Sequence, residues 1–357
     1  MGIDFHYGVL YYLARLAGLS LHQAKTVAHA SQYVNDATTE DALQFEDGQV
    51  FEPIASAHST FDFKREIDEK DCQVSASFHL LPAAQGDSLQ EQAVCRPNSQ
   101  VGQALIRDAL QARSASNGLH RLGVALHAYA ATWANQGFSG VVSDSNRIIW
   151  LEADDFPDWM WFSKLTRSLT HAGDAQPDMT IDHFSGLGRA AALQFPDLPW
   201  AHWTYTTVTG QTVARHNLPD YLEAANMIYK VLAAFQAGSE DFLRFSDLPA
   251  QALTSLSIAL ANNKDHDEET RLHRFGCALA NGMLAGVREP LPRYIKKGPG
   301  SWQSEAIGLI DDECAGDKPR WSPAFEDSDY RKFHEALKTQ QFTVVQEILP
   351  RFGLHLA

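Results

Sequence analysis

One continuous stripe of apolar residues in the middle of the chain constrains the fold most. Leu119, Leu122, Leu126, Ala130 and Trp133 follow one another at intervals of three or four residues, which is the spacing of one face of an α-helix. A helix with one apolar face has to bury that face against other elements. The stripe therefore predicts a core helix ending near Gly137, with further helices packed around it.

Helical signals recur along most of the chain. Ser20 and Gln23 have the spacing of a capping box, in which each side chain satisfies a free backbone N–H group of the other residue. Periodicity predicts the central helix from about 117 and further helices at residues 9–17, 20–34, from 99, from 217, and near 240–262, 267–285, 302–310 and 328–349. We therefore expect an all-α fold, a multi-helix bundle.

Two long stretches lack this periodicity. Residues 38–97 are rich in Glu, Asp, Gly and Pro and include alternating runs such as Val74–Phe78, which are typical of extended chain. We expect an irregular insertion that lies over the helical core. Residues 138–216 form a second, loop-rich stretch, whose tryptophan rings either line a substrate cleft or pack loops onto the core. These tryptophans are Trp150, Trp159, Trp161, Trp200 and Trp203.

The best candidate for a linker is the Gly-Pro-Gly-Ser segment at residues 298–301. It divides the chain into a main helical domain at 1–297, with the insertion at about 38–97, and a C-terminal helical extension at 298–357. Gly and Pro together interrupt helical periodicity, which makes such a segment a natural boundary.

Charge and cysteine usage narrow the class of protein. The net charge of -15 disfavours wrapping around nucleic acid, which needs a basic footprint. Four cysteines stand far apart without a CxxC pair, which fits a reducing compartment better than a disulfide framework. The first residues lack a secretory signal pattern, and the apolar runs are too short to span a bilayer. We expect a cytoplasmic protein without a transmembrane segment. The cysteines are Cys72, Cys95, Cys277 and Cys314.

Several familiar catalytic motifs are absent from the sequence. It has no Walker loop, no GxGxxG after a predicted strand, no HExxH and no GxSxG. Histidine placement remains as the chemical signal, because His120 and His127 lie seven residues apart on one helix face. From spacing alone, these two side chains are either hydrogen-bonded core or surface histidines or metal ligands.

A wider set of residues resembles a known pattern. The run Leu122-Gly-Val-Ala-Leu-His127 resembles a motif in a family of uncharacterised bacterial proteins, which is similar in turn to the fold of zinc-dependent phospholipase C and single-strand nucleases. In that pattern an Asp follows the His by four residues, and another His comes one or two turns later. Further landmarks in matching order cover about residues 4–235. They are Asp4-Phe-His6, Ala30-Ser-Gln-Tyr-Val-Asn-Asp36, Phe78-His79-Leu-Leu-Pro82, Cys95-Arg-Pro-Asn-Ser99, and His171 followed by Pro177-Asp178.

The resemblance implies a metal-dependent hydrolase of phosphoesters, with zinc or another divalent metal as cofactor and a small phosphoester as substrate. Metal ions in such sites activate water and stabilise the leaving oxygen. The catalytic residues themselves stay unassigned. Carried over position by position, the implied metal ligands are His6, Asp36, His79, His127, His171 and Asp178.

Two positions depart from that pattern. Ala131 stands where the pattern has Asp, and Asn135 stands where it has a second His, so two ligands are missing from one helix. Alanine coordinates nothing, and an amide is a poor zinc ligand. Two hypotheses follow: a metal-dependent hydrolase with a diminished site, or a non-catalytic relative that serves as a binding or protein-interaction module.

Overall fold

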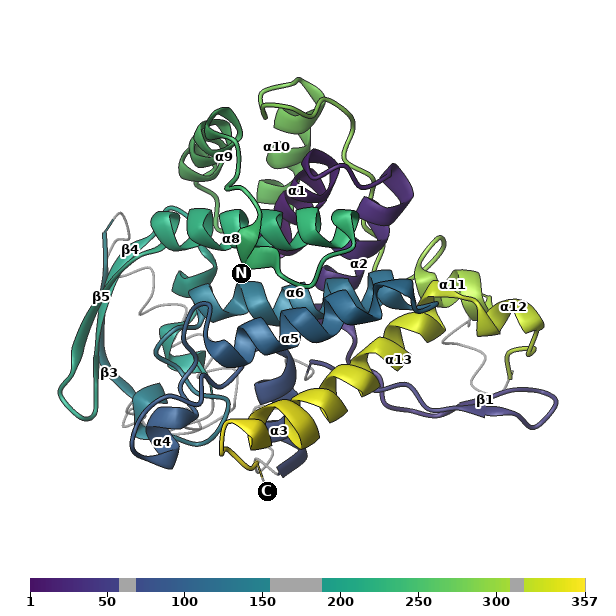
Figure 1. The fold of residues 1–357 in the computed structure, drawn as a ribbon, viewed down its shortest axis with the longest axis horizontal. Helices are drawn as coiled ribbons and strands as arrows, with labels where there is room; N and C mark the ends of the chain where they lie inside the picture. The colour runs from purple at the N-terminus through teal and green to yellow at the C-terminus, as the bar shows by residue number, and fades with distance from the viewer. Residues whose placement is uncertain (58–68, 155–187, 309–317, 357) are drawn as a thin grey trace, which may run out of the picture.

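The computed structural model describes residues 1–57, 69–154, 188–308 and 318–356. The helix α6 (Gly118–Ala134) runs through its centre (Figure 1). Every residue of α6 from Leu122 to Ala134 is buried, as expected for a helix surrounded by others. The helices packed against α6 are α2 (Leu21–Asp36), α3 (Glu69–Phe78), α5 (Gln100–Gln111), α8 (Asn217–Ala237) and α13 (Asp329–Phe342).

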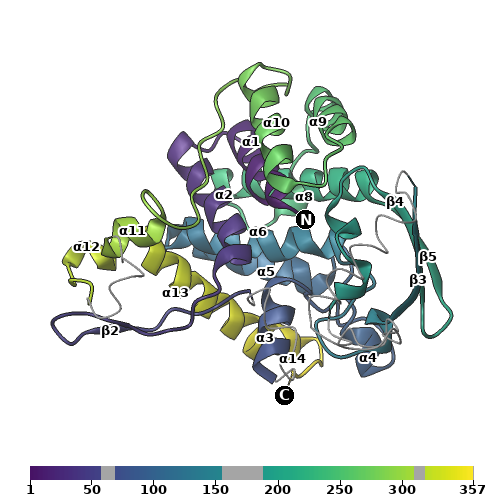
Figure 2. The same ribbon diagram turned by 180° about the vertical axis from the view of Figure 1, so that it is seen from behind.

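The chain begins with a π-helix, η1 (Asp4–Val9), which continues into α1 (Leu10–Leu16). The predicted capping box of α2 is present, because Ser20 Oγ accepts from the Gln23 backbone and Gln23 accepts from the Ser20 backbone. Seen from behind, α1 and α10 (Glu268–Ala280) stand side by side near the N-terminus (Figure 2). A segment from late in the sequence therefore packs against the first turn of the protein.

Shorter helices complete the helical part. The α-helices are α4 (Leu89–Gln92), α9 (Ala250–Asn262), α11 (Trp302–Ile307), α12 (Pro323–Glu326) and α14 (Leu349–Arg351), and a second π-helix is η8 (Thr343–Ile348). The 3-10 turns are η2 (Ala112–Ser114), η3 (Asp144–Asn146), η5 (Ala190–Ala192), η6 (Phe195–Asp197) and η7 (Phe242–Arg244).

The prediction of an all-α fold is wrong, because two small antiparallel sheets accompany the helices. One is the hairpin of β1 (Leu43–Gln44) and β2 (Val50–Phe51), and the other has the order β3-β4-β5 and stands beside the helices (Figure 1). The strands of the second sheet are β3 (Ile148–Ala153), β4 (His202–Thr207) and β5 (Thr212–His216).

The sheet lies in the stretch that we expected to be loops. In β4 buried and less buried residues alternate, with Trp203 and Tyr205 facing the interior, and this alternation of two is the signature of a half-buried strand. Gly210 takes a φ of +81° in the turn to β5, which glycine adopts without strain. The high density of aromatic and β-branched residues favoured strands, and the surrounding Pro, Asp and Gly obscured the pattern.

The predicted extended run at residues 74–78 is also wrong, because it belongs to helix α3. Val74 and Phe78 are four residues apart and both are buried in one apolar cluster with Tyr33 and Phe333. A spacing of four satisfies both a strand period of two and a helical face. Only the packing partner distinguishes the two readings.

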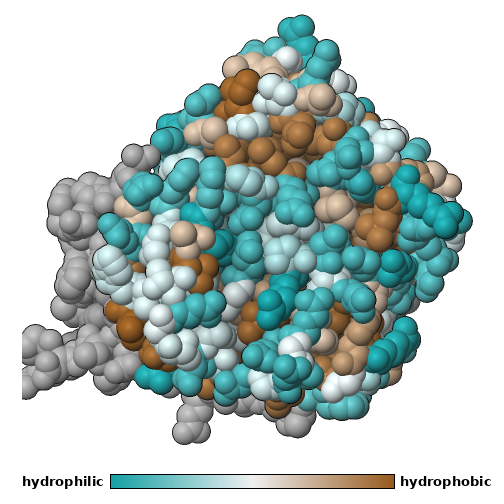
Figure 3. Space-filling view, turned by 60° about the vertical axis from the view of Figure 1, so that its left-hand side comes forward, coloured by the Kyte–Doolittle hydropathy of each residue, from teal (hydrophilic) through white to brown (hydrophobic). Residues whose placement is uncertain are grey.

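Residues after the Gly-Pro-Gly-Ser segment pack onto the main helices. Trp302 and Leu337 share an apolar cluster with Tyr33 of α2 and Val124 of α6. Most of the face in Figure 3 is hydrophilic, and apolar residues gather in its upper part. Within the described ranges, the helices lack the combination of length and hydropathy needed to cross a membrane.

Candidate functional site

The contact between α2 and α6 positions the candidate site. A methyl group added to Gly123 would lie 2.5 Å from the Val27 carbonyl oxygen and 2.6 Å from Ala30 Cβ. Real side chains do not approach so closely, so only glycine allows the two backbones this spacing. The close approach brings the backbone of Ser31, one turn further along α2, next to His127 on α6.

His127 is held in one tautomer. Its side chain is buried, and Nδ1 lies 2.7 Å from the carbonyl oxygen of Ser31. A carbonyl oxygen only accepts, so Nδ1 carries the hydrogen and Nε2 presents its lone pair. Burial, followed by the neighbouring His6 and His79, lowers the pKa of His127 well below its usual value. The imidazole is therefore neutral.

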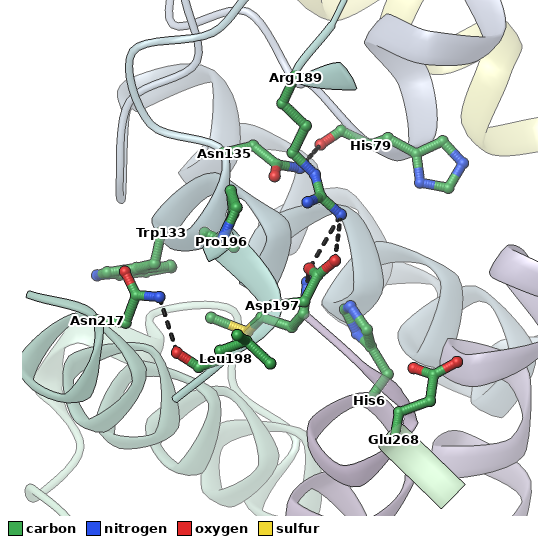
Figure 4. Close-up of polar contacts among 12 residues, drawn as sticks. His6, His79, Trp133, Asn135, Arg189, Pro196, Asp197, Leu198, Asn217 and Glu268 are labelled. Atoms are coloured by element: carbon green, nitrogen blue, oxygen red, sulfur yellow. Dashed lines mark hydrogen bonds and ion pairs between the residues drawn. The ribbon is translucent and has the colours of Figure 1, made fainter. Parts of the chain in front are cut away.

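His79 follows α3 and is fixed at two points. Its Nε2 lies 2.7 Å from the carbonyl oxygen of Ser56 and therefore carries a hydrogen, because a carbonyl oxygen only accepts. Its own carbonyl oxygen accepts a hydrogen bond of 2.8 Å from Asn135 Nδ2, one residue past the end of α6. Figure 4 shows this bond.

The inner nitrogens of the two rings face each other. His127 Nε2 lies 3.4 Å from His79 Nδ1. Two nitrogen ligands about 2.0–2.1 Å from one tetrahedral zinc ion are about 3.4 Å apart. With both outer nitrogens bonded to carbonyl oxygens, as in the outer shell of metal-bound histidines, the pair fits a cation between the rings. A proton is the competing occupant, because a hydrogen on His79 Nδ1 would be donated to the lone pair of His127 Nε2.

His6 completes a cluster of three imidazoles. It lies on η1, and its ring stacks on His127 with centroids 4.0 Å apart and planes inclined by 21°. Ser31 Oγ is 3.5 Å from its Nδ1. Burial, followed by the positive charge of the N-terminal amino group, lowers the pKa of His6 well below its usual value. His6, like His127, is therefore a neutral imidazole.

Ion pairs surround this cluster. Asp197 accepts from Arg189 at 2.7 and 2.9 Å, as Figure 4 shows, and from the amino group of Met1 at 2.7 Å. Burial alone would raise the pKa of Asp197, but Arg189 and the amino group outweigh it and hold the pKa below its usual value. Asp4, two residues before His6, pairs with Arg271 of α10 at 3.0 Å, and both side chains are buried.

The structure brings together three of the six predicted ligands: His6, His79 and His127. Asp36 lies elsewhere, where it accepts hydrogen bonds from Tyr294 Oη at 2.7 Å and Gln32 Nε2 at 3.0 Å. Over residues 1–57, 69–154, 188–308 and 318–356, no three His, Cys, Asp or Glu side chains gather as a complete metal site. Among the described residues, the candidate donors are therefore the facing rings of His79 and His127, and the ring of His6 stacks on His127. The two remaining predicted ligands, His171 and Asp178, lie outside the described residues.

Three positions that matter here were not predicted. Gly123 sets the helix spacing, while the backbone carbonyls of Ser31 and Ser56 set the tautomers. Gly123 stands four residues before His127 in the sequence, so a glycine one turn from a histidine was the available signal. Nothing in the sequence indicates the two carbonyl acceptors, because every residue has one. Asn135, regarded as a lost ligand, instead holds the backbone of His79.

Comparison with known proteins gives one match. The model of a family described as a family of unknown function (DUF6765) matches residues 1–348. This range includes the C-terminal helices through α13. No curated protein and no solved structure matches the chain.

Proposed function

The chain belongs to this family of unknown function, DUF6765, and we propose that it is a metal-binding, hydrolase-like protein that holds one divalent cation between His79 and His127. The observation that carries the proposal is the 3.4 Å separation of His127 Nε2 and His79 Nδ1, with the outer nitrogen of each ring bonded to a carbonyl oxygen on the far side. This separation fits two nitrogen ligands of one tetrahedral zinc ion.

The donor chemistry selects the class of metal. Neutral imidazole nitrogens suit zinc and other borderline transition metals, whereas Mg²⁺ and Ca²⁺ prefer oxygen ligands. The neighbouring charges oppose a proton, because burial and the positive N-terminal amino group lower the pKa of His6, and burial lowers that of His127.

The proposed reaction is hydrolysis of a small phosphoester, which is what the resemblance to the zinc-dependent phospholipase C fold implies. A divalent cation supplies Lewis-acid chemistry that polarises a phosphoryl oxygen. His6 covers one face of the His127 ring and keeps water from it. Asn135 holds the backbone of His79, and the Ser56 carbonyl oxygen holds its ring.

A second candidate function is a binding or protein-interaction module that keeps the scaffold without turnover. Ala131 and Asn135 favour it, because the first offers no donor and the second is committed to His79. In this case a single ion ties α3 to α6 and stabilises the fold, since metal binding to a folded site is also folding free energy.

We also propose that the protein is cytoplasmic. Cys95 is buried and Cys277 is exposed, and neither forms a disulfide. Unbridged cysteines of this kind fit a reducing, cytoplasmic environment.

Zinc titration of the metal-stripped full chain tests the proposal. We expect about one zinc per chain at the buried site and a higher melting temperature, because zinc binds only the folded state. His127→Gln and His79→Gln should both lose this ion, whereas His22→Gln, at an exposed position on α2, should keep it. Equal zinc content and equal thermal stabilisation in all four proteins, each checked by circular dichroism for folding, would contradict a site at this pair.

Turnover separates the two candidate functions. With zinc bound, the hydrolase reading predicts release of p-nitrophenol from a generic phosphodiester, at a rate that falls in proportion to zinc occupancy in the two histidine variants. Zinc binding without turnover supports the structural-ion reading and rules out the hydrolytic one for that substrate class.

A further inference from the structure

The outward face of the three-stranded sheet carries a second pair of histidines. His202 of β4 and His216 of β5 stand directly opposite each other in the antiparallel register. Their ring centroids are 3.8 Å apart, with planes inclined by 37°, and both residues are exposed. Two imidazoles therefore lie side by side in solvent on adjacent strands.

The sheet separates this pair from α6. Arg215, the neighbour of His216, points to the opposite face and donates a hydrogen bond of 2.9 Å to the Trp133 carbonyl oxygen. Trp203, the neighbour of His202, is buried on that inner face as well. Because side chains alternate along a strand, both histidines face away from the candidate site on α3 and α6.

An acidic residue next to the third strand, β3, lies in line with the two histidines. The backbone N–H of Asp154, which follows β3 directly, donates to the His202 carbonyl oxygen at 3.0 Å. Ala153 pairs with Trp203 and Glu152 with Thr204, so Asp154 is the residue opposite His202 and belongs to the same outward face. The row across the three strands is Asp154, His202 and His216.

We propose that His202 and His216 form a solvent-facing site for a borderline divalent transition metal such as Cu²⁺, Ni²⁺ or Zn²⁺. Imidazole nitrogens suit these ions, and affinity rises from Ni²⁺ to Cu²⁺ in the usual order. Opposed residues of an antiparallel pair have Cβ atoms about 4.5–5.5 Å apart, which lets two imidazoles reach one ion. The strands fix the backbone of both residues before the ion binds, so only side-chain entropy is lost.

The charges around the pair suit a cation. Partial burial, and then the neighbouring ring of His202, lower the pKa of His216, while the carboxylate of Asp220 acts in the opposite direction. The ring is therefore available as a neutral ligand near pH 7. The carboxylate of Asp154 on the adjacent strand adds negative charge at the same edge.

This inference does not rest on the proposed function, and variants distinguish the two. Metal-stripped full chain is titrated with Ni²⁺ by calorimetry, and Cu²⁺ at one equivalent or less is followed by electron paramagnetic resonance. The matched set is the parent, His202→Asn, His216→Asn and the exposed-histidine control His22→Asn. All four proteins also carry His127→Gln, so that the buried pair cannot supply two nitrogens to the metal.

We expect His202→Asn and His216→Asn each to weaken Ni²⁺ binding at one site. Loss of a supporting contact alone typically costs a metal site about 10–100-fold in affinity, and loss of a ligand should cost at least as much. The copper spectrum should change from two coordinated nitrogens to one in both variants, while the His127→Gln background and its His22→Asn variant keep the two-nitrogen signal. A copper spectrum and a Ni²⁺ affinity unchanged in His202→Asn or His216→Asn would overturn the proposal. So would a site in the parent no tighter than that of these variants, which would indicate adventitious binding by single histidines.

Discussion

Gly123 lies one helical turn before His127, and its missing side chain lets α6 approach α2 closely enough for His127 to reach a backbone carbonyl. The Cβ of any other residue would lie 2.5 Å from the Val27 carbonyl oxygen. One turn further along both helices, His127 Nδ1 meets the Ser31 carbonyl oxygen at 2.7 Å. The helix spacing and the histidine tautomer therefore depend on one glycine.

Gly123→Ala should destabilise the protein. The added methyl group overlaps the backbone of α2, and overpacking of a tight core typically costs about 1–3 kcal/mol. Denaturant unfolding gives the change in the free energy of unfolding. Zinc affinity should fall in parallel, because the displaced helix carries His127 away from Ser31.

Gly276→Ala in α10 is the matched control. Its added methyl would meet Leu291 Cβ at 3.4 Å, an ordinary van der Waals contact. Alanine favours a helix interior over glycine by about 1 kcal/mol, so this variant should be neutral or more stable. Equal destabilisation by the two substitutions would show that the close approach at Gly123 has no special role.

Asn135→Ala should lower zinc affinity while leaving both histidines in place. The variant removes the 2.8 Å hydrogen bond that holds the His79 carbonyl oxygen, and loss of such supporting contacts typically costs about 10–100-fold in metal affinity. Competition with a chromophoric chelator measures the change. Gln136→Ala serves as the control, since Gln136 bonds the Trp133 carbonyl and Asp220 and not His79. A zinc affinity equal to that of the parent would show that Asn135 does not support the site.

Arg271→Met should be strongly destabilising, because it leaves the buried carboxylate of Asp4 without its partner. Removing one member of a buried ion pair typically costs about 3–5 kcal/mol. The double variant Asp4→Leu/Arg271→Met should recover part of this loss, since no charge is then buried unpaired. Denaturant unfolding measures the three variants. If the destabilisation by the double variant equals the sum of the two single effects, the two side chains, which are 267 residues apart in the sequence, are not coupled. Arg320→Met, in an exposed pair with Glu46, should change stability by about 0–1 kcal/mol.

The free energy of unfolding should fall as pH is lowered, in part through His29. Burial lowers the pKa of His29 to about 3, whereas the unfolded chain takes up a proton near pH 6.5. The unfolded state therefore binds more protons below pH 6.5, and stability falls between pH 6.5 and about 3. Linkage predicts a loss of about 2 kcal/mol from this histidine between pH 8 and pH 5.

His29→Phe should flatten this pH dependence. Both ring nitrogens of His29 are buried without a hydrogen-bond partner in the described part of the chain, and its ring stacks on Trp302 with centroids 3.9 Å apart. Phenylalanine keeps the stacked ring and has no group to protonate, so stability at pH 5 should rise toward its value at pH 8. Urea unfolding at both pH values, with His22→Gln as an exposed control on the same helix, measures the difference. An unchanged slope would mean that His29 is already charged in the folded state.

Local patterns in the sequence were enough for most of the longer helices. The apolar stripe from Leu119 to Trp133 gave the central helix, and Ser20 with Gln23 gave the start of α2, because helical periodicity and capping depend on residues within one or two turns of each other. The same local reasoning failed at Val74 and Phe78, whose spacing fits two periods. It also failed for β4, where strand alternation is hidden among turn-forming residues.

The sequence by itself determined which residues have the chemistry for a metal site, and a resemblance in their order suggested His6, His79 and His127. Only the tertiary structure decided which of them meet, because convergence depends on how helices far apart in the chain pack. Asp36 has the right chemistry but faces Tyr294 and Gln32. His127 and His79 face each other because Gly123 lets α2 approach α6 closely. The carbonyl oxygens of Ser31 and Ser56 then hold the outer nitrogens of the two rings. Backbone carbonyls carry no sequence signature, so no pattern of side chains could have revealed them.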